Sequence, residues 1–411
     1  MGVEKDKLKR EIESALLFAL NKDPKPELIE GLLHWQDVVN FVISRKIAGR
    51  FYKRLKENHL LHLVPDPWLN NVKEFYYFNA LKNKILFKDL ERIATHFKGH
   101  QVNLILLKGA SLLVRGVYQQ GERFQADLDF LVSGISREQL QKEILELGYL
   151  NVHHSDAQDW SEESFVSKGS KGLADISAVF LEFHWTFRPI NHHSGEKLAQ
   201  AILKGAEPIA FNSCVFNVPK PELQFYQAGL HGCAHHPFDS GYFWVALQDL
   251  SAIADRLKLD SDEIINLALE HRLAEHLGVL AFLLKEKLGI FPQLWEGLAS
   301  RIPESKTLVE QTARVVWDGL LNPRPVSLSH FIYLFSPTDP RNRRKAILEL
   351  TGLRRTGEKV QAGKTNLQNP RPGFFALLSY RIRTLDWQFL KMVWQIAKFH
   401  RKVKVYFPWG T

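Results

Sequence analysis

Apolar positions recur every three to four residues through the first hundred positions of the chain, as on one face of an amphipathic helix. We expect helices over residues 5–21, 27–59 and 70–99. A similar helical pattern begins at Pro221 and continues to about Leu298. Helical regions are therefore predicted on both sides of a central segment.

The pattern changes within this central segment. Apolar runs within residues 102–107, 124–132 and 177–187 have the length and composition of buried strands. A short helix is expected between the first two strands, and another over 136–147, where Ser136 is a suitable N-cap. Short strands between helical regions predict an α+β fold with a small mixed sheet.

The length and composition of the chain fit several folded regions. It has 411 residues, of which 45% are hydrophobic and 24% are charged. This ordinary globular composition excludes a disordered chain, a collagen and a disulfide scaffold. We expect a helical region (1–100), an α/β core (101–220), a helical domain (221–340) and a basic linker with an amphipathic C-terminal helix (341–411).

The positive charge is concentrated in the C-terminal region. The chain has a net charge of +9, and residues 341–411 contain 16 basic and 3 acidic residues. An argument for nucleic-acid binding therefore applies to this region and not to the body of the protein. The expected last helix, 374–401, carries an apolar stripe flanked by basic residues. It could pack on the body, lie on an anionic membrane surface or contact nucleic-acid phosphates.

Cysteine usage and hydropathy indicate the compartment. The two cysteines, Cys214 and Cys233, form no CxxC motif, which favours reduced thiols in the cytoplasm. The N-terminus is charged from residue 4 and has no small-residue cleavage site, so we expect no secretory signal. No apolar run reaches the roughly 18 residues of a spanning helix. Peripheral attachment to a membrane through the basic region stays open.

Four side chains of two expected strands could form one acidic site. Asp127 and Asp129 lie two residues apart in DLDFLV and therefore point to the same face. Glu182 and His184 share a face of the strand SAVFLEFHWTF in the same way. If these strands are neighbours, three carboxylates converge, and burying them is costly unless a cation lies between them. Oxygen ligands of this kind suit Mg²⁺ or Mn²⁺. The alternative is a solvated sheet face with scattered acids.

A glycine-containing turn follows the first expected strand and opens a helix. Gly109 would let the backbone approach a phosphate, and the helix N-terminus would supply free N–H groups. Lys108 could meet the phosphate charge, and Ser111 could donate a hydrogen bond. The alternative is an ordinary strand-to-helix turn with a surface lysine.

Two histidines stand four residues apart in the second helical region. His231 and His235 would share one face of a helix, a spacing that can bind zinc. The third ligand would then be Asp249 or His236. The histidines could instead line a substrate pocket or have a structural role.

Three segments, LLKGASLL, RFQADLDFLV and LEFHW, together resemble an uncharacterised nucleotidyltransferase-like family of the polymerase-beta superfamily. Its members typically have a Lys-Gly turn, an arginine four residues before a DxD motif, and an acidic residue in a short His-Trp strand. The matching residues here are Lys108, Gly109, Arg123, Asp127, Asp129, Glu182, His184 and Trp185. The resemblance covers about residues 75–275 and includes a helical segment with paired histidines and a later aspartate.

The resemblance implies a metal-dependent nucleotidyltransferase with its core at 101–220. It would move a nucleoside monophosphate from an NTP, with ATP expected, to a hydroxyl of a small molecule or a protein and release pyrophosphate. The turn reads Lys-Gly-Ala-Ser where many active members have Gly-Ser adjacent. This keeps open a catalytically silent member that binds a nucleotide or a partner.

The resemblance also implies residue roles. Asp127, Asp129 and Glu182 would hold two Mg²⁺ or Mn²⁺ ions. Arg123 would neutralise charge in the transition state or only form a salt bridge with the acidic pair. Glu182 or His184 would act as the base. The nucleotide would be bound by Lys108, Gly109, Ser111 and Arg123, and the acceptor pocket would contain His184, His231, His235 and Asp249.

Overall fold

The computed structural model describes residues 2–152, 162–169, 176–187, 194–235, 240–321, 395 and 398–399. Within the expected basic linker and C-terminal helix (341–411), the described residues are therefore 395, 398 and 399. The predicted contacts of that region with a membrane or with nucleic acid stay predictions.

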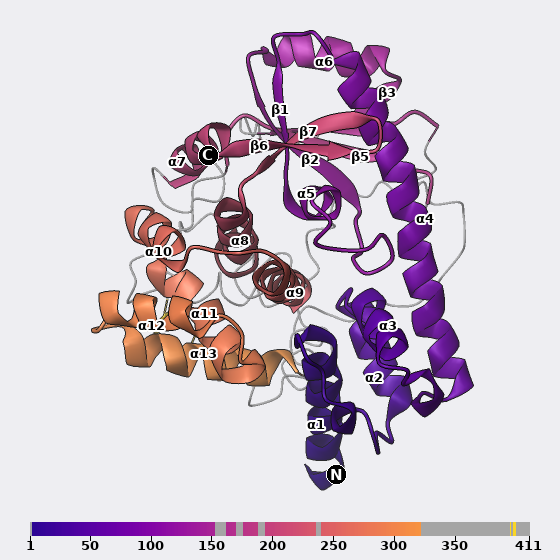
Figure 1. Ribbon diagram of the computed structural model, residues 1–411, viewed down its shortest axis with the longest axis vertical. Coiled ribbons are helices and arrows are strands. Elements are labelled where there is room, and N and C mark those ends of the chain that lie inside the picture. The colour runs from indigo at the N-terminus through magenta and orange to yellow at the C-terminus, as the bar shows by residue number, and fades with distance from the viewer. Residues whose placement is uncertain are drawn as a thin grey trace, which may run out of the picture.

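A mixed seven-stranded sheet forms the centre of the upper part of the molecule (Figure 1). Its strands are β1 (Asn103–Leu106), β2 (Asp127–Ser133), β3 (Tyr149–Asn151), β4 (Glu162–Ser167), β5 (Phe180–His184), β6 (Ala206–Phe211) and β7 (Cys214–Pro219). They lie in the order β3-β4-β5-β2-β1-β7-β6. Together with the surrounding helices, this sheet confirms the predicted α+β fold.

The register of the sheet brings the two acidic strands together. Strand β2 pairs with β1 in antiparallel and with β5 in parallel orientation. Asp129 lies directly opposite Glu182, and His184 lies opposite Leu131, the next residue on the same face of β2. The two strands are thus neighbours, which was the condition for the predicted acidic site.

The N-terminal helices lie below the sheet, and one long helix connects the two levels (Figure 1). These are α1 (Gly2–Leu20), α2 (Trp35–Ser44), α3 (Ala48–Glu57) and the long α4 (Asp66–His96). The single helix expected over 27–59 is wrong, because the chain turns between α2 and α3 at Lys46, which has a left-handed φ of 61°. This turn lets Gly49 pack so closely on the backbone at Gly121 and Glu122 that a Cβ there would overlap both carbonyls.

The remaining helices flank the sheet and form a second helical layer below it (Figure 1). They are α5 (Lys108–Val114), α6 (Arg137–Glu146), α7 (Ser194–Lys204), α8 (Pro221–Leu230), α9 (Ser240–Arg256), α10 (Ser261–Glu270), α11 (Ala274–Leu288), α12 (Pro292–Arg301) and α13 (Lys306–Leu320). Ser136 caps α6 in a capping box with Gln139, as its sequence position predicts. A π-helical turn, His231–His235, follows α8.

A buried arginine joins helices that are far apart in sequence. Arg50 of α3 is fully buried and donates to the carbonyl oxygens of Ala19 and Gln248 and to the hydroxyl of Ser251. It therefore links α1 and α3 to α9. Such contacts run across the predicted regions, whose boundaries at residues 100, 220 and 340 stay predictions.

Two further expectations concern the thiols and the membrane. Cys214 and Cys233 are both free, as expected, and Cys233 is buried. None of the helices in the described part of the chain has the length and apolar character needed to cross a bilayer.

Candidate functional site

Strands β2 and β5 place three potential metal ligands on one face of the sheet. Asp129, Glu182 and His184 each offer an atom within 4.8 Å of the others. Asp129 is only 1% exposed, and its Oδ2 has no hydrogen-bond partner among the described residues. A buried carboxylate oxygen without a partner is costly, so this cluster is suited to receive a cation. The solvated sheet face considered as an alternative does not fit this burial.

The residue set differs slightly from the predicted metal ligands. His184 belongs to the compact group, whereas Asp127 stands two residues earlier on β2. His184 Nε2 lies 3.4 Å from Asp129 Oδ1, and His184 Nδ1 lies 3.5 Å from Glu162 Oε2. The imidazole is therefore held among carboxylates at the acidic site itself.

The turn after β1 brings a lysine into the acidic cluster. Lys108 is the first residue of α5, and its Nζ lies 2.5 Å from Asp129 Oδ1 and 3.8 Å from Glu182 Oε2. Its backbone is left-handed, with φ of 48°, a conformation that L-residues rarely adopt. Such local strain is typical of functional sites. The sequence predicted that Lys108 meets phosphate charge and did not indicate this ion pair.

The crowded carboxylates perturb one another. Burial and then the charge of Asp129 raise the pKa of Asp127 to about 6 and that of Glu182 to about 8. Burial would also raise the pKa of Asp129, but the ammonium of Lys108 and the hydrogen bond with His184 outweigh it and hold this pKa well below its usual range. A further cation would favour the ionised form of all three.

Arg123 has a partner that the sequence did not indicate. Its Nε and Nη2 each lie 2.8 Å from an oxygen of Asp249 on α9, and both residues are buried. Tyr118 also donates to Asp249 Oδ1, at 2.9 Å. The structure thus shows Arg123 in a salt bridge with Asp249 and not with the acidic pair of β2. Its predicted role in the transition state stays a prediction. Asp249 is therefore the ion-pair partner of Arg123, and its predicted place in the acceptor pocket stays a prediction.

Gly109 is required because neighbouring side chains leave no room for a Cβ atom. A Cβ at this position would overlap Arg123 Nη1 and Gln125 Oε1. The same two atoms are hydrogen-bonded at 2.8 Å, and Gln125 Nε2 lies 3.3 Å from Asp127 Oδ1. Gln125, which sequence reasoning missed, therefore connects Arg123 to the first aspartate. Its position two residues before Asp127 was the available signal.

Ser111 faces inward from the first turn of α5. It is buried, its hydroxyl donates to the carbonyl of Lys108 at 2.7 Å, and it accepts from Gln224 Nε2 of α8 at 2.9 Å. These bonds stabilise the turn that carries Lys108. The predicted contact of Ser111 with phosphate stays a prediction.

Helix α4 holds the loop that carries Arg123. Asn79 donates to the carbonyl of Gly121 at 3.2 Å, and Asn83 donates to that of Arg123 at 3.0 Å. Both asparagines are fully buried. Sequence reasoning missed them, although two asparagines four residues apart on one helix face are an unusual pair to bury.

A second lysine lies near the first aspartate. The ammonium of Lys46 is 5.1 Å above the ring centroid of Phe124, and its charge partly offsets the rise in the pKa of Asp127. Lys46 comes from the turn between α2 and α3. The N-terminal helices thus contribute charge to the site, which the sequence did not indicate.

The predicted histidine pair is only partly visible. The ring of His231 packs edge-on against Tyr242, with 5.2 Å between the centroids. The side chain of His235 lies outside what the structure describes. Zinc binding and a place in the acceptor pocket stay predictions for both residues.

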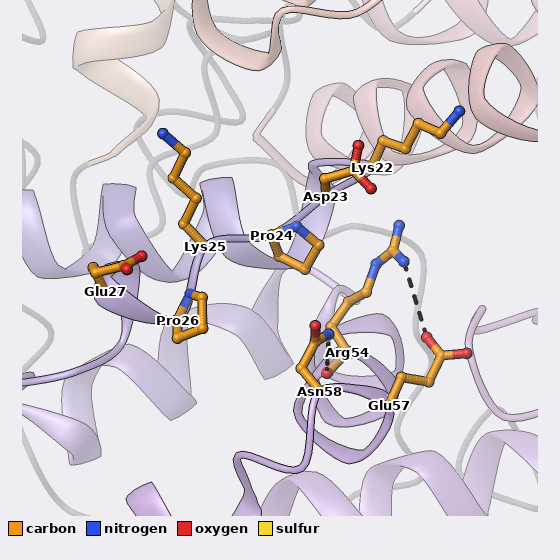
Figure 2. A pocket seen from close by; sticks show the side chains of 9 residues that line it. All are labelled: Lys22, Asp23, Pro24, Lys25, Pro26, Glu27, Arg54, Glu57 and Asn58. Atoms are coloured by element: carbon orange, nitrogen blue, oxygen red, sulfur yellow. Dashed lines mark hydrogen bonds and ion pairs between the residues drawn. The ribbon is translucent and has the colours of Figure 1, made fainter.

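An open groove of about 920 Å³ lies elsewhere, beside the segment between α1 and α2 (Figure 2). It is lined by charges of both signs, including Lys22, Lys25, Arg54 and Glu57. Figure 2 shows Arg54 directed toward Glu57, 3.9 Å away. No residue of the acidic cluster lines this groove, so the groove is separate from the candidate site.

Comparison with known proteins identifies a family. The model of a family described as an uncharacterised nucleotidyltransferase matches residues 32–289. This span is more than half of the chain and contains the acidic cluster, Lys108, Arg123 and Asp249. No curated protein and no solved structure matches the chain.

Proposed function

Because the chain belongs to the uncharacterised nucleotidyltransferase family that its sequence resembles, we propose that it transfers a nucleoside monophosphate from an NTP, with ATP expected, to a hydroxyl group. The acceptor is a small molecule or a protein. Its oxygen forms a bond to the α-phosphorus, the bond from that phosphorus to the β-phosphate oxygen breaks, and pyrophosphate leaves.

The observation that supports this proposal is the convergence of Asp129, Glu182 and His184 beside Lys108. Asp129 Oδ2 is buried and has no hydrogen-bond partner in the part of the chain that the structure describes. This oxygen and the carboxylate-rich donor set fit a hard divalent cation, with Mg²⁺ or Mn²⁺ expected. Asp127, Asp129 and Glu182 would hold it, with His184 in reach. Such an ion supplies Lewis-acid activation of the phosphate and the acceptor hydroxyl.

The remaining residues bind and orient the nucleotide. Lys108 and the backbone at Gly109 stand at the N-terminus of α5, where positive charge and free N–H groups would bind the β- and γ-phosphates. Ser111 keeps this turn in shape through the carbonyl of Lys108. Arg123 orients Asp127 through Gln125. The contribution of these residues is positioning and electrostatic stabilisation.

The acceptor hydroxyl must lose a proton during the reaction. Glu182 and His184 stand on the same face of β5, at the acidic site, and Glu182 is partly exposed. Glu182 or His184 would therefore accept this proton.

The proposal is tested by titrating Mg²⁺ together with each NTP and following the heat-unfolding midpoint. The native protein should be stabilised by one nucleotide in a metal-dependent way, whereas D127N/D129N should not respond. D318N serves as a control, because Asp318 is an exposed acid far from the site in sequence. The nucleotide that stabilises the protein is then used, labelled at the α-phosphate, to search for labelled acceptors.

The outcomes distinguish an active nucleotidyltransferase from a catalytically silent member of the family. Stabilisation without transfer to any acceptor, unchanged in D127N/D129N, would favour a catalytically silent nucleotide-binding protein. No response of the native protein to any NTP with Mg²⁺ or Mn²⁺ would contradict the proposed reaction.

A further inference from the structure

The ammonium of Lys108 occupies the place where a cation is expected among the acids. It contacts Asp129 Oδ1 at 2.5 Å and lies 3.8 Å from Glu182 Oε2. Both carboxylates belong to the group of potential ligands described above. The free protein thus balances the charge of this cluster with its own lysine.

A divalent ion on the same carboxylates would stand close to this ammonium. Asp129 Oδ1 is shared by Lys108 and His184, whereas Asp129 Oδ2 is buried and has no hydrogen-bond partner among the described residues. Whichever oxygen receives the ion, an ammonium on the same carboxylate would repel it. Solvent screens this repulsion poorly, because Asp129 is almost fully buried. The ion and the ammonium therefore compete.

We propose that Lys108 is an internal competitor of the divalent ion: it pairs with Asp129 in the free protein and moves to the nucleotide phosphates when the ion binds. This inference rests on the proposed function and adds a coupling between binding of the metal ion and binding of the nucleotide. The metal ion alone binds weakly, and the metal ion and the nucleotide bind cooperatively.

The position of Lys108 permits such a movement. The side chains of Lys108 and Glu182 are 26% and 32% exposed, so the cluster opens to solvent on their side. The backbone of Lys108 is held in place, because its carbonyl accepts a hydrogen bond from Ser111. Rotation of the side chain alone can therefore take the ammonium away from Asp129 without moving α5.

Coupling of this kind is reciprocal. Phosphates that attract the ammonium of Lys108 free Asp129 for the ion, and an ion at Asp129 releases the ammonium to the phosphates. Couplings between two sites are usually about 5-fold to 150-fold in affinity, and we expect a value in this range.

The test measures binding of Mn²⁺ alone to the full chain, by electron paramagnetic resonance of the free ion. K108M should bind Mn²⁺ about tenfold more tightly than the native protein, within the usual range of such couplings. K108G is a second variant, since glycine accepts the left-handed backbone at this position. K108R keeps the charge and should bind Mn²⁺ as weakly as the native protein.

A surface lysine controls for net charge. K142M also removes one positive charge, but Lys142 is 76% exposed and pairs only weakly with Glu146, 4.0 Å away. Its Mn²⁺ affinity should equal that of the native protein. The heat-unfolding midpoint of each variant shows that it is folded before its affinity is compared.

The second measurement adds α,β-methylene-ATP, which cannot transfer its nucleotide. In the native protein it should tighten Mn²⁺ binding, after the ion held by the nucleotide itself is subtracted with a protein-free titration. In K108M and K108G this gain should be smaller, because only the part that depends on Lys108 is lost. The proposal is overturned if these variants bind Mn²⁺ no more tightly than the native protein.

Failure of this inference is distinguishable from failure of the proposed function. If the native protein binds Mn²⁺ as tightly as K108M does, and D127N/D129N does not bind it, the metal site is supported and the competition is excluded. Absence of Mn²⁺ binding in the native protein and in both Lys108 variants contradicts the metal site and the competition together.

Discussion

Arg123 and Asp249 form a two-armed ion pair, with both N–O distances at 2.8 Å, between the loop that precedes β2 and helix α9. The two residues are 126 positions apart in the sequence. Through Gln125, the same guanidinium reaches Asp127. The second helical layer therefore contributes directly to the geometry of the acidic site.

Removing one partner of this pair should destabilise the protein strongly. D249A leaves Arg123 charged and buried without its counter-ion, which costs about 3–5 kcal/mol in other buried pairs. We expect this loss in the free energy of unfolding, measured with denaturant. E286A breaks the exposed pair with Arg314 and should cost at most about 1 kcal/mol. Equal effects of D249A and E286A would contradict the structural role of the buried pair.

Gly109 should not tolerate a side chain. In G109A the new Cβ overlaps Arg123 Nη1 and Gln125 Oε1, so the guanidinium must move away from Gln125. We expect a loss of about 1–3 kcal/mol in the free energy of unfolding, typical of overpacking. The nucleotide-dependent rise in the heat-unfolding midpoint should also decrease. At Gly31 a Cβ would meet no atom within 4 Å, so G31A should show only the cost of its left-handed backbone.

Gln125 should act on metal binding through Asp127. Q125L removes the hydrogen bond to Asp127 Oδ1 and the acceptor for Arg123. Loss of a group that orients a metal ligand typically lowers metal affinity about 10-fold to 100-fold. We expect a decrease in this range for Mn²⁺. Q120L is the matched control, because the Gln120 side chain is exposed in the same loop. Unchanged Mn²⁺ affinity in Q125L would show that Asp127 needs no such support.

His276 should make stability depend on pH. Burial lowers the pKa of this histidine from 6.5 to about 4, so the folded protein keeps it neutral while the unfolded chain takes up a proton. The resulting decrease in the free energy of unfolding is absent above pH 6.5 and grows as the pH falls toward 4. The full difference is about 3 kcal/mol, from 1.36 kcal/mol for each unit of pKa.

Denaturant unfolding of the native protein and of H276L, between pH 7.5 and 4.5, measures this effect. The free energy of unfolding should fall more steeply with decreasing pH in the native protein than in H276L. Parallel curves would mean that His276 is protonated in the folded state as readily as in the unfolded chain.

Local patterns were sufficient for much of the fold and for the acids. The period of two along DLDFLV and LEFHW placed Asp127 with Asp129, and Glu182 with His184, on common strand faces. The N-cap at Ser136 could likewise be predicted from the sequence, because a helix begins where a side chain can satisfy its first N–H groups. The family resemblance, which the match over residues 32–289 confirms, rests on the same short segments.

The tertiary structure decided what faces those acids. The sequence by itself determined which residues share a strand face, because alternation is a property of the local backbone. It did not determine the ion pair of Arg123 with Asp249, the bridge through Gln125 or the approach of Lys46. The ion pair and the approach of Lys46 depend on which helices pack against the loop before β2, and contacts between positions so far apart in the sequence leave no local periodicity. The bridge through Gln125 lies within that loop, and its geometry depends on where Asp249 holds Arg123. The turn at Lys46 divides an apolar pattern that reads as one helix, since the chain must reverse there to bring Gly49 onto that loop.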